Sequence, residues 1–231
     1  MYQRKHYFFA LFLVCLVCNL WAGDVATFVD LGFSPDGKAY MFAQYGIQSQ
    51  TLKPWADLYV VDVNRNVFVP GGRISYVHTG PVVAGQDGSG ALYRLIAKNA
   101  ALADQHRVDF LIQGQPLYVS LNHDGLNNET IEFRDFESGA SYKAVLNSFV
   151  EGTGANLRSS FYISVDKTSA NGSRSSYIVG TPDIKRPLIT SYRIRKVMIA
   201  PKDGSMIFAV EMRKQSGSTF DIRYMVEALR L

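Results

Sequence analysis

Residues 32–43 read Gly-Phe-Ser-Pro-Asp-Gly-Lys-Ala-Tyr-Met-Phe-Ala, and residues 198–209 read Met-Ile-Ala-Pro-Lys-Asp-Gly-Ser-Met-Ile-Phe-Ala. In both stretches an apolar run enters a turn at a proline and leaves it after an Asp-Gly pair. The turn residues are Pro35, Asp36 and Gly37 in the first stretch and Pro201, Asp203 and Gly204 in the second. Proline fixes φ at the turn entry and glycine permits the reversal. Each stretch therefore predicts a β-hairpin whose strands both pack inward.

Further runs rich in β-branched and aromatic residues extend this pattern along the chain. They lie at 58–63, 117–121, 130–136, 142–150, 161–166, 176–180, 188–199, 206–212 and 220–229. Four Asp-Gly pairs and one Asn-Gly pair separate many of them, and such pairs tolerate the positive φ values of tight hairpins. Parallel strands would need long crossovers instead. We expect a mainly β fold, an antiparallel meander of hairpins that is propeller-like or sandwich-like.

One amphipathic helix is expected at about 90–104, within this strand-rich chain. Leu92 and Leu95 recur there at helical spacing with Ile96 and Leu102, while Arg94 and Lys98 face away. Ser89 or Asp87 could cap its start. A single helix of this kind is expected to cover an open end or a face of the sheet.

The phrase Phe-Ser-Pro-Asp-Gly-Lys, followed by an apolar strand and then Leu-Tyr-Val-Val-Asp-Val, resembles the repeat of TolB-like and WD-type β-propeller blades. The resemblance covers residues 28–69 and, more faintly, 194–229. The layout runs from a charged and then apolar amino terminus, through Phe-Ser-Pro-Asp-Gly near the start, to Arg223-Tyr224-Met225-Val226-Glu227 near the end. This whole layout also resembles a bacterial family of predicted secreted proteins with no assigned function. That second resemblance implies an exported location and no activity. Matching hairpins at both ends further suggest that the terminal segments pair to close the structure.

The amino-terminal residues 1–22 are typical of a signal peptide. Arg4 and Lys5 precede an apolar run too short to span a bilayer, and small residues at Ala22 and Gly23 offer a cleavage point. Both cysteines lie in this segment, so an exported domain of residues 23–231 would have no disulfide. The pattern favours a periplasmic or secreted protein over a lipidated one, and no stable transmembrane helix after processing.

The charge pattern argues against a nucleic-acid partner. The formal net charge is +4, and removal of Arg4 and Lys5 would halve it. Residues 181–231 carry 10 basic and 5 acidic side chains, whereas residues 24–180 carry 12 and 15. An anionic partner could use the basic excess, but a solvated sheet face is the favoured interpretation. The residues concerned are Lys185, Arg186, Arg193, Arg195, Lys196, Arg213 and Lys214.

Motifs for metal binding and catalysis are weak. His78, His106 and His123 have no partners at metal-ligand spacing, and residues 62–66 imitate a calcium loop but are better explained as a hairpin turn. Ser164 and Lys167 match a Ser-x-x-Lys motif, although both fall within one expected hairpin rather than on a helix. We expect no cofactor and no metal.

Acidic and aromatic residues supply the remaining candidates. Carboxylates for glycoside hydrolysis could come from Asp30, Asp36, Asp57 and Asp62, although aspartates at turns usually serve the backbone. An aromatic set could line a ligand groove, but core packing is the commoner fate for such residues. It comprises Tyr40, Tyr45, Trp55 and Tyr59. Asn128 and Asn171 match glycosylation acceptors and are interpreted as turns.

The sequence is best explained as a non-catalytic, exported module of the bacterial cell envelope that binds an envelope protein or a polysaccharide. One alternative is an envelope hydrolase whose carboxylates come together only in the fold. A second is a small outer-membrane β-barrel, which the helix and the final Leu231 argue against.

Overall fold

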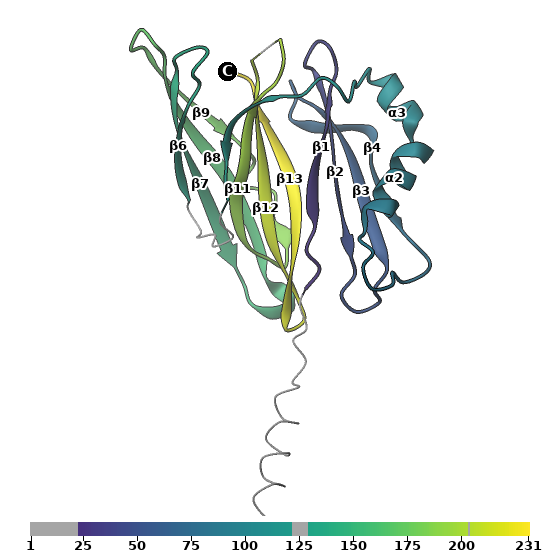
Figure 1. Ribbon diagram of the computed structural model, residues 1–231. Coiled ribbons are helices and arrows are strands. Elements are labelled where there is room, and N and C mark those ends of the chain that lie inside the picture. The colour runs from purple at the N-terminus through teal and green to yellow at the C-terminus, as the bar shows by residue number, and fades with distance from the viewer. Residues whose placement is uncertain (1–22, 122–128, 203) are drawn as a thin grey trace, which may run out of the picture.

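A computed structural model describes residues 23–121, 129–202 and 204–231. Within these ranges the chain forms antiparallel β-sheets that stack as layers, with helices on one outer side. Figure 1 shows the layers from left to right as an outer sheet, a central sheet, an N-terminal sheet and the helices. The expected mainly β, antiparallel fold is confirmed, in its sandwich-like form. The resemblance to propeller blades is not confirmed.

The N-terminal sheet has the order β1-β2-β3-β4. Its strands are β1 (Thr27–Phe33), β2 (Ala39–Ile47), β3 (Pro54–Asp62) and β4 (Val67–Val77). The sequence pattern missed β4, because Pro70-Gly71-Gly72 interrupts it like a turn. In the fold the pairing of β3 with β4 shifts register between Tyr59 and Val61, and Gly71 has φ +71°. β4 is therefore an irregular edge strand, where a proline needs no ladder partner.

The central sheet has the order β13-β12-β11-β5. Its strands are β5 (Gln115–Val119), β11 (Ile189–Ile199), β12 (Met206–Ser216) and β13 (Thr219–Leu229). The outer sheet follows the path β10-β8-β7-β6, with β9 also paired to β8. These strands are β6 (Thr130–Arg134), β7 (Ser141–Glu151), β8 (Arg158–Thr168), β9 (Arg174–Val179) and β10 (Arg186–Pro187), and a 3-10 turn, η1 (Gly154–Asn156), joins β7 to β8.

The part of the central sheet near the β11–β12 turn is buried on both faces. Along β12, Met206, Phe208 and Val210 pack in a core with the outer sheet, while Ile207 packs in a second core with the N-terminal sheet. Successive side chains of a strand point to opposite faces, so a strand covered on both sides needs an unbroken apolar run. The stretch Met206–Val210 is such a run and is fully buried.

The two similar hairpins of the sequence face each other across this second core. Phe33, Tyr40 and Phe42 come from the β1–β2 hairpin, whereas Met198 and Ile207 come from the β11–β12 hairpin. The hairpins thus belong to different sheets. The terminal segments do meet, through a parallel bridge between Val25 and Ile222.

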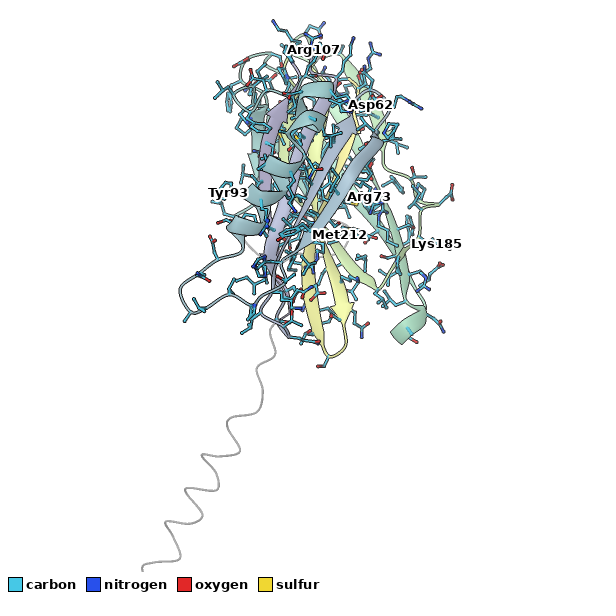
Figure 2. All side chains as sticks on the ribbon, turned by 90° about the vertical axis from the view of Figure 1, so that its right-hand side faces the viewer. Asp62, Arg73, Tyr93, Arg107, Lys185 and Met212 are labelled. Atoms are coloured by element: carbon cyan, nitrogen blue, oxygen red, sulfur yellow. The ribbon has the colours of Figure 1, made fainter. Side chains whose placement is uncertain are left out.

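The expected helix is present in two pieces, α2 (Ser89–Lys98) and α3 (Ala100–Gln105), which are separated at Asn99. Leu92 and Leu95 pack against the N-terminal sheet, and Tyr93 lies on the outer side of α2 (Figure 2). Ser89 does not cap the helix, because Gly88 occupies the N-cap position. The Asp87 carboxylate accepts the Ser89 N–H at 3.0 Å.

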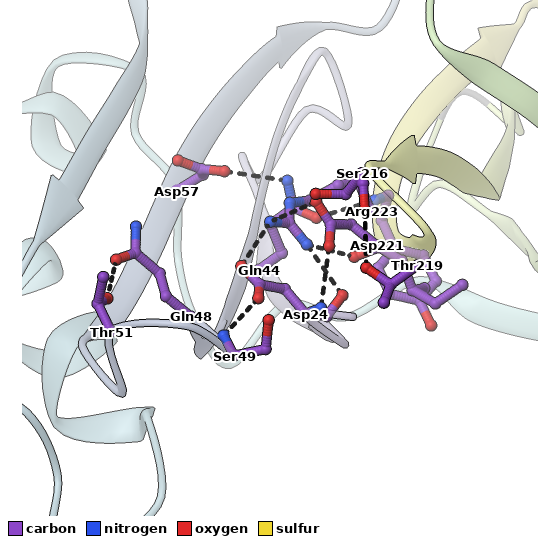
Figure 3. A network of polar contacts seen from close by, with 12 residues as sticks. Asp24, Gln44, Gln48, Ser49, Thr51, Asp57, Ser216, Thr219, Asp221 and Arg223 are labelled. Carbon is purple, nitrogen blue, oxygen red and sulfur yellow. Dashed lines mark hydrogen bonds and ion pairs between the residues drawn. The ribbon is translucent and has the colours of Figure 1, made fainter. Parts of the chain in front are cut away.

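The free edge of β13 is capped by the N-terminal sheet. Gln44 Oε1 accepts the backbone N–H of Tyr224 at 2.8 Å, and Asn66 Oδ1 accepts that of Ala228 at 2.7 Å. The N–H of Ile222 donates to the carbonyl of Asp24 at 2.8 Å. Figure 3 shows this corner, where Asp24 also binds Arg223. Side chains of the N-terminal sheet therefore form hydrogen bonds with backbone N–H groups at the edge of the central sheet.

Glu227 of β13 joins the three sheets. Its carboxylate accepts a hydrogen bond from Asn66 Nδ2 at 2.5 Å, in the β3–β4 turn, and lies 3.6 Å from Nη2 of Arg186 in β10. Burial raises the pKa of Glu227, while the Asn66 hydrogen bond and the Arg186 charge oppose that rise. The buried carboxylate thus connects the layers and carries a desolvation cost.

We expect Glu227→Gln to change how the free energy of unfolding depends on pH. Because the folded pKa is raised, Glu227 contributes stability below its ordinary pKa of about 4.5 and loses it as pH rises through the folded value. The variant lacks this loss, so its stability relative to the parent protein should increase as the pH rises above about 4.5. Urea unfolding measures the difference, with the exposed Glu137→Gln as control. A difference that stays constant with pH would contradict this role.

Candidate functional site

A groove of about 420 Å³ opens on the face of the central sheet that is turned toward the N-terminal sheet. Its polar lining comprises Ser191, Arg193, Glu211, Arg213 and Tyr224, and its apolar lining includes Val25, Phe220 and Ile222. We call this hollow the Arg193 groove.

Strand register places the polar side chains together. Arg193 of β11 is paired with Glu211 of β12, which is paired in turn with Tyr224 of β13. Directly paired residues of neighbouring strands point to the same face. A second row of the same kind runs from Ser191 through Arg213 to Ile222. The groove is therefore built from two adjacent cross-strand rows.

Glu211 is held by two donors. Its Oε2 atom lies 3.3 Å from Nε of Arg195 and accepts the Tyr224 hydroxyl at 3.1 Å. Burial, followed by the negative charge of Glu211, raises the pKa of Tyr224 to about 12. Tyr224 is thus a hydrogen-bond donor throughout the neutral range.

The guanidinium of Arg193 has an ion-pair partner but lacks some of its hydrogen bonds within the described ranges. The residue is only 8% exposed, and its Nε lies 3.8 Å from Oε1 of Glu129, which is an ion pair but too long for a hydrogen bond. Within the part of the chain that the structure describes, Nε and Nη1 of Arg193 are buried without hydrogen-bond partners. The other oxygen of Glu129, Oε2, accepts the Ile194 N–H at 3.3 Å. Burial raises the pKa of Glu129.

The groove has an excess of positive charge. Arg193 and Arg195 face the two carboxylates of Glu129 and Glu211, whereas Arg213 stacks over the ring of Phe220, with 3.9 Å from Cζ to the ring centroid. Three guanidinium groups against two carboxylates leave one uncompensated positive charge. Such an arrangement favours an anion.

Most of the basic side chains in residues 181–231 that were considered above form ion pairs. The interpretation of these side chains as a solvated sheet face is therefore wrong for Arg186, Arg193 and Arg195. The side chains of Arg186, Arg193 and Arg195 are 17%, 10% and 17% exposed. Several of the carboxylate partners come from the more acidic first part of the chain. The pairs are Lys185–Glu151, Arg186–Glu227, Arg193–Glu129, Arg195–Glu211 and Lys196–Asp30.

The four candidate carboxylates for hydrolysis are only partly brought together. Asp36 and Asp62 line one hollow of about 580 Å³, close to Arg107, and Figure 2 places Asp62 and Arg107 at the same end of the molecule. The Ser34 hydroxyl lowers the pKa of Asp36, whereas a general acid needs a raised pKa. Asp30 binds Lys196, and Asp57 binds Gln44. The hydrolase hypothesis stays a prediction that rests on Asp36 and Asp62.

The aromatic candidates mainly pack in the interior. Tyr40 and Trp55 are buried, Tyr59 stacks on Phe42 with ring centroids 4.7 Å apart, and Tyr45 packs in the core beneath the helices. These four residues therefore stabilise the N-terminal sheet.

The motif residues take structural positions. Ser164 and Lys167 lie three residues apart on β8, so their side chains point to opposite faces. Residues 62–66 form the β3–β4 turn, where Asp62 accepts the Arg65 N–H. His78 bonds Tyr76, and His106 lines the hollow with Asp36.

The remaining candidates are turn or terminal residues. Asn171 accepts the Ser173 N–H in a turn. Pro35, Asp36 and Gly37 form the β1–β2 turn, and Pro201 and Gly204 lie in the β11–β12 turn. Ala22, His123, Asn128 and Asp203 lie outside the described residues. In the described ranges no group of histidines and carboxylates is arranged to hold a metal ion.

Sequence reasoning missed Glu129, Glu211 and Tyr224 as members of a site. One signal was present, because Glu211 follows directly after the buried run Met206–Val210. A carboxylate at the end of such a run needs a partner. The partner strands could not be identified without the register.

Comparison with known proteins identifies one family. The model described as "Predicted secreted protein (DUF2259)" matches residues 41–230. No curated protein and no solved structure matches the chain. Among the residues that the structure describes, no helix is long and apolar enough to cross a membrane.

We expect Glu129→Gln to lower the free energy of unfolding by about 3 kcal/mol, because it leaves the Arg193 charge buried without a carboxylate. The double variant Glu129→Gln/Arg193→Met should recover part of this loss, since no unpaired charge then remains. Urea unfolding of both single variants and the double variant measures the coupling. Glu132→Gln, on the exposed face of β6, is the control. Strictly additive losses would contradict the pairing.

Proposed function

We propose a binding function for this chain, which belongs to the predicted secreted protein family (DUF2259). It is an exported, non-catalytic protein of the cell envelope, periplasmic or secreted, that holds an anionic group of its ligand in the Arg193 groove. The description of the family and the signal-like residues 1–22 support export. The groove supports binding.

A single observation carries the proposal, namely the unsatisfied guanidinium of Arg193. A buried donor without a hydrogen bond costs about 1–3 kcal/mol, and two such atoms lie on one side chain. The nearest carboxylate, that of Glu129, is too distant to accept a hydrogen bond. The Arg193 side chain borders the groove, so a carboxylate or phosphate entering there would supply charge and acceptors once the guanidinium turns toward it. The guanidinium fork matches both groups in geometry.

The polar groups of the groove favour binding over catalysis. A general acid or base must exchange a proton with its substrate. Tyr224 keeps its proton because its pKa is raised to about 12, and Glu211 is already engaged by Arg195 and Tyr224. These groups hold a fixed arrangement of charge around the opening.

Nuclear magnetic resonance of arginine Nε–Hε groups tests the proposal directly. The purified protein is titrated separately with inorganic phosphate and with acetate at constant ionic strength. We expect the Arg193 resonance, identified by its loss in Arg193→Lys, to shift and saturate with at least one anion. Arg158, whose guanidinium donates to the backbone carbonyls of Ala155 and Leu157 in the turn before β8, provides the control resonance. An Arg193 resonance that does not respond to either anion would overturn the proposal.

A further inference from the structure

The Arg193 groove has two chemically different parts. Arg193, Glu211 and Tyr224 form the charged part in the middle of the central sheet. The second cross-strand row, which runs from Ser191 through Arg213 to Ile222, lies nearer the β12–β13 turn. Phe220 and Ile222 share a face of β13 there because they lie two residues apart. Val25 stands beside Ile222 through the parallel bridge. The three side chains form an apolar strip along one wall.

The apolar strip is open to solvent. Val25 is 62% exposed and Phe220 is 37% exposed. Single exposed apolar residues are ordinary, but these adjacent ones stand at the mouth of a hollow and offer apolar contact to a ligand that enters it. The strip lies next to the charged part because Arg213 is directly paired with Ile222.

Arg213 connects the two parts. Its guanidinium lies over the ring of Phe220, and the side chain is exposed. The same arginine therefore contributes positive charge to the groove and borders its apolar wall. The volume of about 420 Å³ falls within the range of small-molecule sites.

We propose that the ligand of the Arg193 groove is a single-chain amphiphilic anion. Its carboxylate or phosphate head lies between Arg193 and Arg213, and its hydrocarbon chain lies along Val25, Phe220 and Ile222. This inference rests on the proposed function, because it assumes that the groove holds an anion. The charge excess accounts for the head, and the exposed strip accounts for the chain.

A homologous series of probes tests the chain contact. Inorganic phosphate, methyl phosphate, butyl phosphate and octyl phosphate are titrated below their micelle-forming concentrations, with octyl glucoside as an uncharged probe. Each methylene that leaves water strengthens binding by about fourfold. We expect affinity to rise from methyl to octyl phosphate, and octyl glucoside to bind far more weakly than octyl phosphate.

Two variants locate the contacts of the chain and the head. Val25→Ser should weaken octyl phosphate by about tenfold and leave inorganic phosphate unchanged, because it removes apolar surface while the backbone bridge to Ile222 remains. Val83→Ser is the matched control, since Val83 is also exposed, at 66%, and lies outside the groove lining. Arg193→Lys should weaken every phosphate probe. Thermal unfolding of each variant verifies that the fold is retained.

The outcomes separate this inference from the proposed function. Binding of inorganic phosphate that depends on Arg193 but gains nothing from chain length would overturn the amphiphilic ligand and leave anion binding intact. Chain-length dependence that is unaffected by Val25→Ser and Arg193→Lys would place the amphiphile elsewhere, and would also overturn the inference. If no phosphate probe or acetate binds, the proposed function fails as well.

Discussion

The burial of β12 on both faces is the constraint on which the structure depends. A strand in that position needs apolar side chains on both faces. The edges of its sheet also need hydrogen-bond partners, because buried backbone N–H and C=O groups without partners are costly. Phe208 and Ile207 satisfy the first need on opposite faces. Gln44 and Asn66 satisfy the second on the β13 side, and the Glu129 carboxylate accepts the Ile194 N–H on the β11 side. The N-terminal and outer sheets thus stabilise the central one by packing and by direct hydrogen bonds to its edges.

The same arrangement generates the candidate site. The core between the N-terminal and central sheets is formed by residues near the β11–β12 turn, such as Met198 and Ile207. Toward the β12–β13 turn the same face of the central sheet carries Arg193, Glu211 and Arg213 instead, around a groove. Glu211 has its partners within the central sheet, whereas the carboxylate that pairs with Arg193 is Glu129, which lies next to β6 of the outer sheet. The charge asymmetry along the chain is therefore largely balanced by long-range ion pairs, whereas Nε and Nη1 of Arg193 lack hydrogen-bond partners among the described residues.

Local features of the sequence predicted the elements well, whereas the site depended on long-range register. The alternation in residues 220–229 and the Pro-Asp-Gly turn at residue 35 identified β13 and the β1–β2 hairpin. Neither could show that the two similar hairpins stack face to face, since an apolar run does not specify which sheet covers it. β4 was not predicted, because Pro70 is typical of a turn. The apolar spacing predicted one continuous helix, whereas the structure has two helices separated at Asn99. Glu129 could not be matched to Arg193 from the sequence, because their proximity is created only when the outer sheet lies on the central one.

Native-state hydrogen exchange at the edge of the central sheet tests the account most directly. If the N-terminal sheet closes that edge, the backbone N–H groups of Tyr224 and Ala228 should exchange only through global unfolding. Their free energies of opening would then equal that of the Phe208 N–H in the buried strand β12. Rapid exchange of Tyr224 and Ala228, at the rate of an open edge strand while Phe208 stays protected, would contradict it. The central sheet would then be held by face packing alone.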